Sequence, residues 1–257
     1  MRTREPLPLV VEGLSLRFGG VTALDDVSFR IDPGEMLALI GPNGAGKTSA
    51  INCLTGAYIP QRGTIRLGEH RVGGGIEPAK LGISRTFQNL GLFENLSVVD
   101  NILLGRHLLM RTGFLTGALW WGLAKREEAE HRERVEEVIE FLELERHRHD
   151  TVGFLPYGIQ KRVELGRAIA AEPRLLLLDE PATGMNFEET ADIARYLVEL
   201  RERFELSVLL VEHDMKLVMD LADRVMVLDF GSQIALGTPD EVQADERVIE
   251  AYLGAPA

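Results

Sequence analysis

The chain has 257 residues, of which 45% are hydrophobic and 26% are charged, a composition typical of a soluble globular protein with ample material for a core. Its net charge of −12 works against general binding to nucleic acids, and no apolar run approaches the roughly 18 residues that a membrane-spanning helix needs. The first ten residues lack the apolar segment of a secretory signal, and the single cysteine, Cys53, excludes an intramolecular disulfide. We therefore expect a cytoplasmic protein in which Cys53 is a small buried core residue.

Short apolar runs predict strands along most of the chain. The runs are LVVEGLSLRF (9–18), VSFRI (27–31), MLALI (36–40), TIRL (64–67), LLLLD (175–179), SVLLVE (207–212) and RVMVLD (224–229). The later runs alternate with helical segments, which is the pattern of a mainly parallel sheet covered by helices. The run LLLLD is apolar on both faces, as in a strand buried on both sides. These features predict an α/β fold.

The segment MLALIGPNGAGKTSAINCLTG predicts a phosphate-binding loop. A strand leads into the pattern G-x-x-x-x-G-K-[ST], and a helical segment follows. The loop comprises Gly41, Pro42, Asn43, Gly44, Ala45, Gly46, Lys47, Thr48 and Ser49. Its backbone N–H groups would surround phosphate oxygens, with Lys47 on the β- and γ-phosphates and Thr48 on Mg²⁺. The alternative, a plain glycine turn before a helix, is disfavoured by the strand–loop–helix context.

The middle of the chain is helical from Val99 to Leu144 and predicts a helical lobe, about residues 89–164, inserted into an α/β core of residues 7–88 and 165–257. The two parts would form one domain over 7–256. An apolar segment, GFLTGALWWGLA (113–124), is expected to pack within the lobe, and the alternative is that it docks a partner protein. Three histidines, His131, His147 and His149, predict a solvated helix end rather than a metal site.

Acidic residues follow the apolar run 175–179. Asp179 ends this strand, where its carboxylate would be available to Mg²⁺, and Glu180 could accept a proton from an attacking water. The alternative is a solvated acidic turn. His213 ends another strand, at the sheet edge where α/β proteins bind ligands, and could contact a phosphate; a structural or surface histidine is the alternative.

These motifs, in this order, resemble the ATP-binding subunits of ABC transporters over nearly the whole chain. The resemblance implies a P-loop NTPase (RecA-like) core with an antiparallel β subdomain and an inserted helical subdomain, which binds ATP and Mg²⁺. Phe18, in LRFGGVTALDDVSF, matches the residue that stacks on adenine. Gln88, in ISRTFQNLGLF, matches the glutamine that senses Mg²⁺ and contacts the membrane partner.

The same resemblance implies the roles of the acidic end. Asp179 matches the aspartate of the Mg²⁺ site, Glu180 the catalytic base, and His213 the switch histidine. The segment PATGMN (181–186) lies where the dimer-contacting loop is expected. A nucleotide-binding switch without turnover is disfavoured because both Glu180 and His213 are present.

The segment LPYGIQKRVELGRAIA aligns with the family signature, Leu-Ser-Gly-Gly-Gln followed by a helix. In the family, two subunits pack head to tail and each signature caps the ATP of the other, so Tyr157 and the backbone near Gly158 would face a γ-phosphate. Here Pro156 replaces the serine, Tyr157 the first glycine and Ile159 the glutamine. We expect this loss of donors to weaken ATP-driven closure without abolishing it.

The long helical segment 107–144, the ending 211–254 and the PYG turn look like the first ATP-binding subunit of branched-chain (hydrophobic) amino-acid importers. This implies a place on the inner face of the cell membrane, as a peripheral subunit. The implied partners are two permeases, a second ATP-binding subunit in a homo- or heterodimer, and, indirectly, an extracytoplasmic binding protein that selects the cargo.

Other classes stay open. A related ATPase of a lipid or lipopolysaccharide exporter shares a similar turn but usually lacks the long 113–125 insertion. A urea-type importer would look much the same. A soluble ABC protein of translation or DNA repair usually carries a second nucleotide domain or a long coiled coil, which this sequence lacks.

Overall fold

The computed structural model describes residues 4–73, 75–86, 90–110 and 121–253. Its strands are β1 (Leu9–Phe18), β2 (Val21–Ile31), β3 (Met36–Ile40), β4 (Arg62–Leu67), β5 (His70–Arg71), β6 (Ile83–Arg85), β7 (Leu175–Asp179), β8 (Ser207–Val211), β9 (Arg224–Asp229) and β10 (Ser232–Gly237). Its α-helices are α1 (Lys47–Leu54), α2 (Pro78–Leu81), α3 (Val98–Leu104), α5 (Trp121–Phe141), α6 (Tyr157–Ala170), α7 (Phe187–Phe204), α8 (Met215–Leu221), α9 (Pro239–Gln243) and α10 (Glu246–Leu253). Short 3₁₀ turns are η1 (His107–Leu109), η2 (Glu145–His147) and η3 (Val152–Phe154).

The strands form two sheets. A six-stranded sheet has the order β10-β9-β3-β8-β7-β6, in which all neighbours are parallel except the antiparallel edge strand β10. A four-stranded antiparallel sheet has the order β2-β1-β4-β5. The predicted α/β fold with an antiparallel subdomain is therefore confirmed.

The two faces of the parallel sheet belong to different cores. Leu37 and Leu39 of β3 pack with α1 and the antiparallel sheet, whereas Met36 of the same strand packs with the helices on the other face. In β7, Leu175 and Leu177 likewise join the first core, and Leu176 and Leu178 join the second. Because side chains alternate along a strand, these apolar runs cover both faces, as the sequence predicts.

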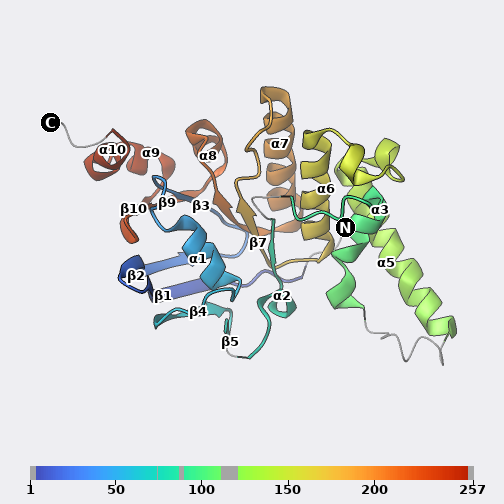
Figure 1. The fold of residues 1–257 in the computed structure, drawn as a ribbon, viewed down its shortest axis with the longest axis horizontal. Coiled ribbons are helices and arrows are strands. Elements are labelled where there is room, and N and C mark those ends of the chain that lie inside the picture. The colour runs from blue at the N-terminus through green and yellow to red at the C-terminus, as the bar shows by residue number, and fades with distance from the viewer. Residues whose placement is uncertain (1–3, 74, 87–89, 111–120, 254–257) are drawn as a thin grey trace.

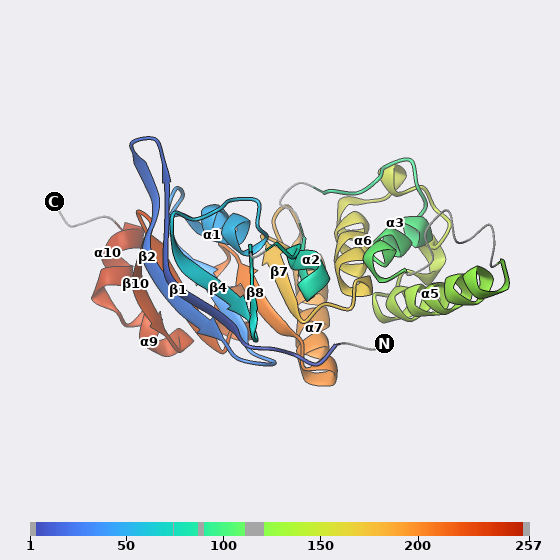
Figure 2. The ribbon, with the colours of Figure 1, turned by 90° about the horizontal axis from the view of Figure 1, so that it is seen from below.

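The helical lobe lies at one end of the molecule, where Figures 1 and 2 show α3, α5 and α6 together. Val135, Val138, Ile139 and Leu142 of the α5 region are fully buried there, as their spacing predicts. Their cluster also contains strand residues such as Leu176, so lobe and sheet share one core. Helix α6 is continuous across the proposed lobe boundary at residues 164–165, and the division at that point stays a proposal.

One expectation about the lobe is wrong. His131 is buried rather than solvated, and its Nδ1 atom accepts a hydrogen bond of 2.7 Å from Arg106 Nε. Arg106 also donates to the carbonyl oxygen of Ala170 and to Glu172, at 2.9 and 3.0 Å. Burial and the nearby Arg106 charge lower the pKa of His131. His147 pairs with Asp150.

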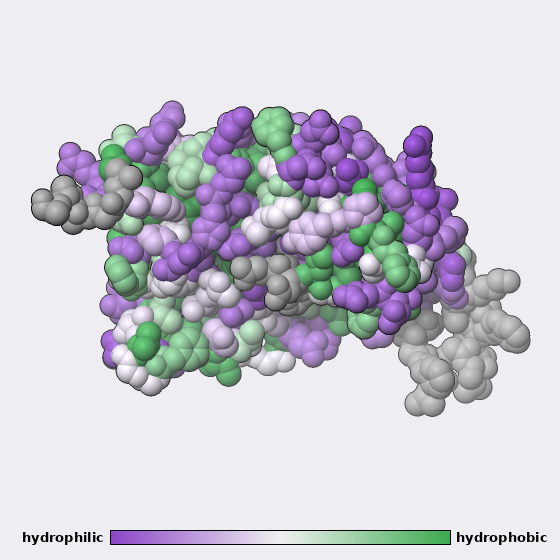
Figure 3. Space-filling view, turned by 45° about the horizontal axis from the view of Figure 1, so that its top comes forward, coloured by the Kyte–Doolittle hydropathy of each residue, from purple (hydrophilic) through white to green (hydrophobic). Residues whose placement is uncertain are grey.

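The surface mixes hydrophilic and hydrophobic side chains. Figure 3 shows a face that is mostly hydrophilic, with its hydrophobic side chains in separate patches. Among the described ranges, no helix has the length and apolar character needed to cross a membrane. Of the apolar segment 113–124, residues 113–120 lie outside the described part, and α5 begins at Trp121. Its role stays a prediction.

Candidate active site

The glycine-rich loop connects buried strand β3 to helix α1, as predicted. Its three glycines have positive φ angles of 148° at Gly41, 83° at Gly44 and 105° at Gly46, in a region that favours glycine. A Cβ atom at Gly41 would collide with the carbonyl oxygen of Leu228, and one at Gly46 would lie 2.5 Å from the carbonyl oxygen of Ala23. At Gly44 a Cβ atom would meet nothing within 4 Å, because this part of the loop faces open space. The loop is thus fixed at its ends and open in its middle.

Lys47 begins helix α1 and is 7% exposed. Its Nζ atom donates to the carbonyl oxygens of Gly41 and Pro42, at 2.7 and 3.0 Å. Burial lowers the pKa of Lys47, while the carboxylates of Glu180 and Asp179 oppose that shift. No side chain caps the start of α1, and its first turn holds no acidic residue. A buried cation and a helix start without a side-chain cap, beside an open loop, fit a polyphosphate.

Asp179 ends strand β7 and is 2% exposed. Its Oδ2 atom accepts a hydrogen bond of 2.7 Å from Arg85 Nη2, and the other guanidinium nitrogen, Nη1, donates to Asn52 Oδ1 at 2.7 Å. Asn52 lies four residues after Thr48 on α1, so the two share a face of that helix. A buried carboxylate that faces the helix of Thr48 fits the oxygen ligands that Mg²⁺ prefers.

Glu180 and His213 lie side by side at the end of the sheet. His213 Nε2 and Glu180 Oε1 are 2.9 Å apart, and the hydroxyl of Thr183 donates to Glu180 Oε2 at 3.2 Å. The backbone N–H of Glu180 donates to the carbonyl oxygen of Val211, at 2.8 Å, which ties β7 to β8 at this point. Glu180 has φ of 52°, an uncommon conformation for a residue other than glycine. The turn therefore directs Glu180 away from Asp179 and toward His213.

A pocket of about 310 Å³ unites these residues. Of the predicted residues, those that line it are Asn43, Gly44, Ala45, Gly46, Lys47, Thr48, Ser49, Glu180 and His213. Val21, Thr22 and Ala23 of β2 complete the lining. Gly41, Pro42 and Asp179 do not line the pocket, whereas Gln88 falls outside the described residues.

Phe18 lies at the end of β1, just before the turn that leads to the β2 part of the pocket lining. Its side chain is 47% exposed, and its ring meets that of Tyr58 edge to face, with 5.0 Å between ring centroids. The sequence analysis missed Tyr58. An exposed aromatic pair beside the pocket offers an apolar surface on which a flat base could stack.

The signature turn does not reach this pocket. Pro156 is the N-cap of α6 and gives it no side-chain hydrogen bond. Tyr157 is 40% exposed, and its ring lies over the loop at Gly184, where a Cβ atom would come within 3.2 Å of it. Gly158 is buried against Glu189. Figures 1 and 2 show α6 on the opposite side of β7 from α1.

A buried carboxylate joins two loops beside the site. Glu212 is 2% exposed, and its two oxygens accept hydrogen bonds from the backbone N–H groups of Ala182 and His213, at 2.9 and 3.0 Å. Burial raises the pKa of Glu212, and the backbone N–H groups of Ala182, His213 and Asp214 oppose the shift. The sequence analysis missed Glu212, although its place directly before His213 was visible in the sequence.

Comparisons with known proteins agree with this geometry. Residues 24–183 match the family model of the ABC transporter, and residues 232–257 match that of the branched-chain amino acid ATP-binding cassette transporter. The high-affinity branched-chain amino acid transport ATP-binding protein LivG of Salmonella typhimurium is 42% identical over 252 residues, which cover 97% of this chain and 98% of LivG. The corresponding protein BraF of Pseudomonas aeruginosa is 41% identical, over 96% of this chain and 97% of BraF.

Solved structures show the same fold. The ADP conformation of MJ1267, an ATP-binding cassette of an ABC transporter, has a TM-score of 0.81 at 31% identity, covering 98% of this chain and all of that one. A nucleotide-free ATP-binding cassette also gives 0.81, at 30% identity, over 96% of this chain and 99% of that one. The chain therefore belongs to the ATP-binding subunits of ABC transporters and is an ATPase with the P-loop fold of that family.

Proposed function

We propose that the chain is the ATP-hydrolysing motor of an importer for branched-chain, hydrophobic amino acids, bound to the inner face of the cell membrane. One observation supports the choice of cargo: the identity of 41–42% to LivG and BraF extends over nearly the full length of this chain and of each relative. The family match at 232–257 supports it independently, because this segment lies outside the nucleotide site.

In the proposed nucleotide site, the backbone from Gly41 to Ser49 surrounds the phosphates and Phe18 stacks on the base. Lys47 supports this role because it is already held at the loop by two carbonyl oxygens, which an approaching phosphate would replace as its partner. Mg²⁺, held by Thr48, Gln88 and Asp179, would neutralise charge on the β- and γ-phosphates.

Hydrolysis is assigned to the pair Glu180 and His213. Glu180 would accept a proton from the attacking water, and His213 would hold the γ-phosphate. The 2.9 Å separation of His213 Nε2 and Glu180 Oε1 supports joint action, since both side chains also line the pocket beside Lys47. The uncommon backbone at Glu180 supports a functional position, because such strain persists where the surroundings impose it.

The signature turn would act on a second subunit. Tyr157 and Gly158 lie outside the pocket of their own chain, so they can face a nucleotide only across a dimer. Backbone N–H groups at the start of α6, 14 residues long, and the helix dipole would face the partner's γ-phosphate. We expect ATP to close two such subunits head to tail, as a homodimer or with a sister subunit.

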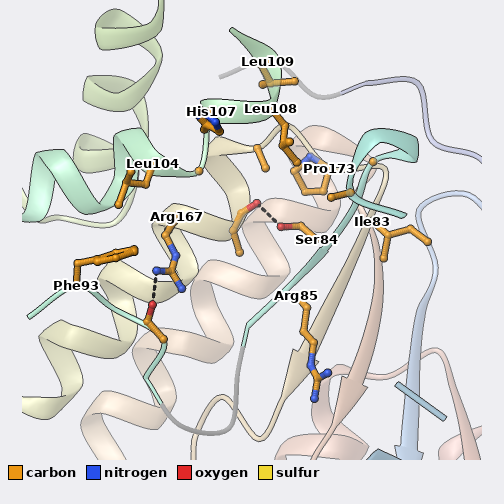
Figure 4. A pocket seen from close by; sticks show the side chains of 16 residues that line it. Ile83, Ser84, Arg85, Phe93, Leu104, His107, Leu108, Leu109, Arg167 and Pro173 are labelled. Atoms are coloured by element: carbon orange, nitrogen blue, oxygen red, sulfur yellow. Dashed lines mark hydrogen bonds between the residues drawn. The ribbon is translucent and has the colours of Figure 1, made fainter. Parts of the chain in front are cut away.

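A second cavity, of about 470 Å³, offers a place for a permease segment. Figure 4 shows it between the core, at Ile83 and Pro173, and the lobe, at Leu104 and Leu108. Most of its labelled lining is apolar, as expected where a partner helix or loop packs. Because the cavity lies between core and lobe, movement of the lobe against the core would displace a permease segment bound there.

Co-purification tests the proposed function. We would tag the chain, solubilise membranes in mild detergent and identify the bound proteins by mass spectrometry. The expected result is two polytopic permeases and a second ATP-binding subunit. Permeases of a lipid exporter or a urea-type importer would contradict the proposed cargo, and ribosomal or DNA-associated partners without a membrane protein would contradict the transport role.

A further inference from the structure

Arg85 connects three parts of the site that the sequence presents separately. Its guanidinium group bridges Asn52 on α1 and Asp179 at the end of β7, each at 2.7 Å, and its side chain is 14% exposed. Arg85 is also the last residue of β6, three positions before Gln88. Arg85 therefore belongs to the strand that precedes Gln88 in the sequence. Its side chain contacts the helix of Thr48, through Asn52, and the strand of Asp179.

One carboxylate oxygen of Asp179 is engaged by a cation of the chain itself. Oδ2 pairs with Arg85, and the backbone N–H of Asp179 donates to Thr86 Oγ1 at 3.3 Å. Because Asp179 is 2% exposed, its charge is poorly solvated and depends on a nearby cation. Arg85 supplies a cation at short distance, and a divalent cation at Asp179 would have to share the carboxylate with that guanidinium group.

Arg85 also lies at the border of the second cavity. It lines the groove between core and lobe, and Figure 4 shows its guanidinium directed away from the apolar lining residues Leu104, Leu108 and Leu109. One side chain thus borders the groove while its charged end holds the carboxylate of the metal site.

We infer that Arg85 is a positioning residue that competes with Mg²⁺ for the carboxylate of Asp179. Arg85 holds this carboxylate before Mg²⁺ binds, and it lowers the affinity of the nucleotide-bound site for Mg²⁺. The inference rests on the proposed Mg²⁺ site at Asp179. Removing the charge of Arg85 should therefore tighten Mg²⁺ binding, while a lysine at this position, which keeps the charge, should tighten it less.

The test is the dissociation constant of Mg²⁺ at saturating ADP, measured by calorimetry on the wild type, Arg85→Gln and Arg85→Lys. We expect Arg85→Gln to bind Mg²⁺ about ten-fold tighter, since a charge-assisted hydrogen bond is worth about the 1.4 kcal/mol that corresponds to that factor. Arg85→Lys, which keeps the positive charge but loses the planar fork that holds both Asn52 and Asp179, should tighten Mg²⁺ binding less than Arg85→Gln does. Equal or weaker binding by Arg85→Gln would overturn the inference, because Arg85 would then support the metal site rather than compete with it.

A second measurement does not depend on the folding of Arg85→Gln. In the wild type with ADP, the ¹⁵N side-chain resonances of Arg85 should shift when Mg²⁺ is added, and an unchanged signal at saturation would overturn the inference. A wild type that binds no Mg²⁺ in the presence of ADP would contradict the proposed metal site itself. The affinity of Arg85→Gln and the Arg85 resonances thus test the competition, whereas Mg²⁺ binding by the wild type tests the metal site.

Discussion

The pocket at Lys47 and the turn at Tyr157 differ in what a single chain completes. Around Lys47, residues from β2, the glycine loop and the ends of β7 and β8 line one cavity. Tyr157 and Gly158 pack instead against the loop and helix that follow β7, at Gly184 and Glu189. ATP binding at the Lys47 pocket, which one subunit completes, should therefore tolerate changes in the turn at Tyr157. ATP hydrolysis should need both the pocket and the turn.

The largest effect is expected from Glu180→Gln. Loss of the general base should reduce ATP hydrolysis by about 10²–10⁴-fold while ATP still binds, so that closed dimers accumulate. Phosphate release measures the first effect, and sedimentation with saturating ATP and Mg²⁺, together with any sister subunit that co-purifies, measures the second. Glu188→Gln, an exposed glutamate on α7, is the matched control. Near-normal phosphate release from Glu180→Gln would rule out this residue as the base.

Gly158→Ala should separate the two halves. The added Cβ atom would collide with Oε1 of Glu189, whose carboxylate accepts from the backbone N–H of Asn186. The Asn186 side chain accepts in turn from the backbone N–H of Glu189, and this capping box fixes the start of α7. We expect hydrolysis to fall about ten-fold or more, the factor for one hydrogen bond to a charged group. ATP affinity of the isolated chain should stay unchanged. Gly20→Ala, where a Cβ atom meets nothing within 4 Å, is the control. Loss of ATP affinity in Gly158→Ala would contradict the separation.

The lobe should carry its own pH dependence through His131. Burial and Arg106 lower its folded-state pKa below the ordinary value of about 6.5, so the neutral form is favoured by folding. Its contribution to stability is therefore complete above about pH 6.5 and is lost as pH falls through the lowered pKa. His131→Asn, which retains an acceptor for Arg106, should lose less unfolding free energy between pH 7.5 and 5.5 than the wild type does.

Denaturant unfolding at both pH values measures this difference. His147→Asn, at a partly exposed histidine of the same lobe, is the matched control for the loss of a histidine. Identical pH dependence of His131→Asn and the wild type would show that the buried Arg106–His131 contact does not govern the stability of the lobe.

The smallest effect is expected from Pro156→Ser. Pro156 caps α6 without a side-chain hydrogen bond, and a serine would add a hydroxyl at the N-cap or toward a partner's phosphate. In the Glu180→Gln background, the ATP-bound dimer should tighten by roughly three- to ten-fold, as one added hydrogen bond of about 0.5–1.5 kcal/mol allows. Equal or weaker dimerisation in sedimentation would contradict the expectation that the altered turn weakens ATP-driven closure.

Local rules account for the parts that the sequence predicts. The strands at 36–40 and 175–179 match the observed bounds, because strands buried on both faces need uninterrupted apolar residues. The strand at 9–18 also matches, because its apolar residues alternate with polar ones over much of its length. The start of α1 at Lys47 follows from the glycines that precede it. Strands β5, β6 and β10 were not predicted, since β5 and β6 are two and three residues long and β10 is a partly exposed edge strand.

Long-range contacts account for what the sequence analysis missed. Arg85 lies 94 positions from Asp179, and only the pairing of β6 with β7 brings them together. Glu212 reaches Ala182, 30 positions away, in the same manner. His131 was misjudged because the residues around it in sequence are charged and suggest an exposed helix end, whereas in space it is buried and accepts a hydrogen bond from Arg106, 25 positions away.

The most direct test of the proposed motor is transport by the purified complex. The chain and its co-purified permeases would be reconstituted into liposomes with ATP and Mg²⁺ on the side of the ATP-binding subunits and the extracytoplasmic binding protein on the other, and movement of radiolabelled leucine would be measured. We predict ATP-dependent accumulation of leucine with the wild type and none with Glu180→Gln. Leucine movement that is equal in both, or a wild type that hydrolyses ATP without moving leucine, would contradict the proposed function.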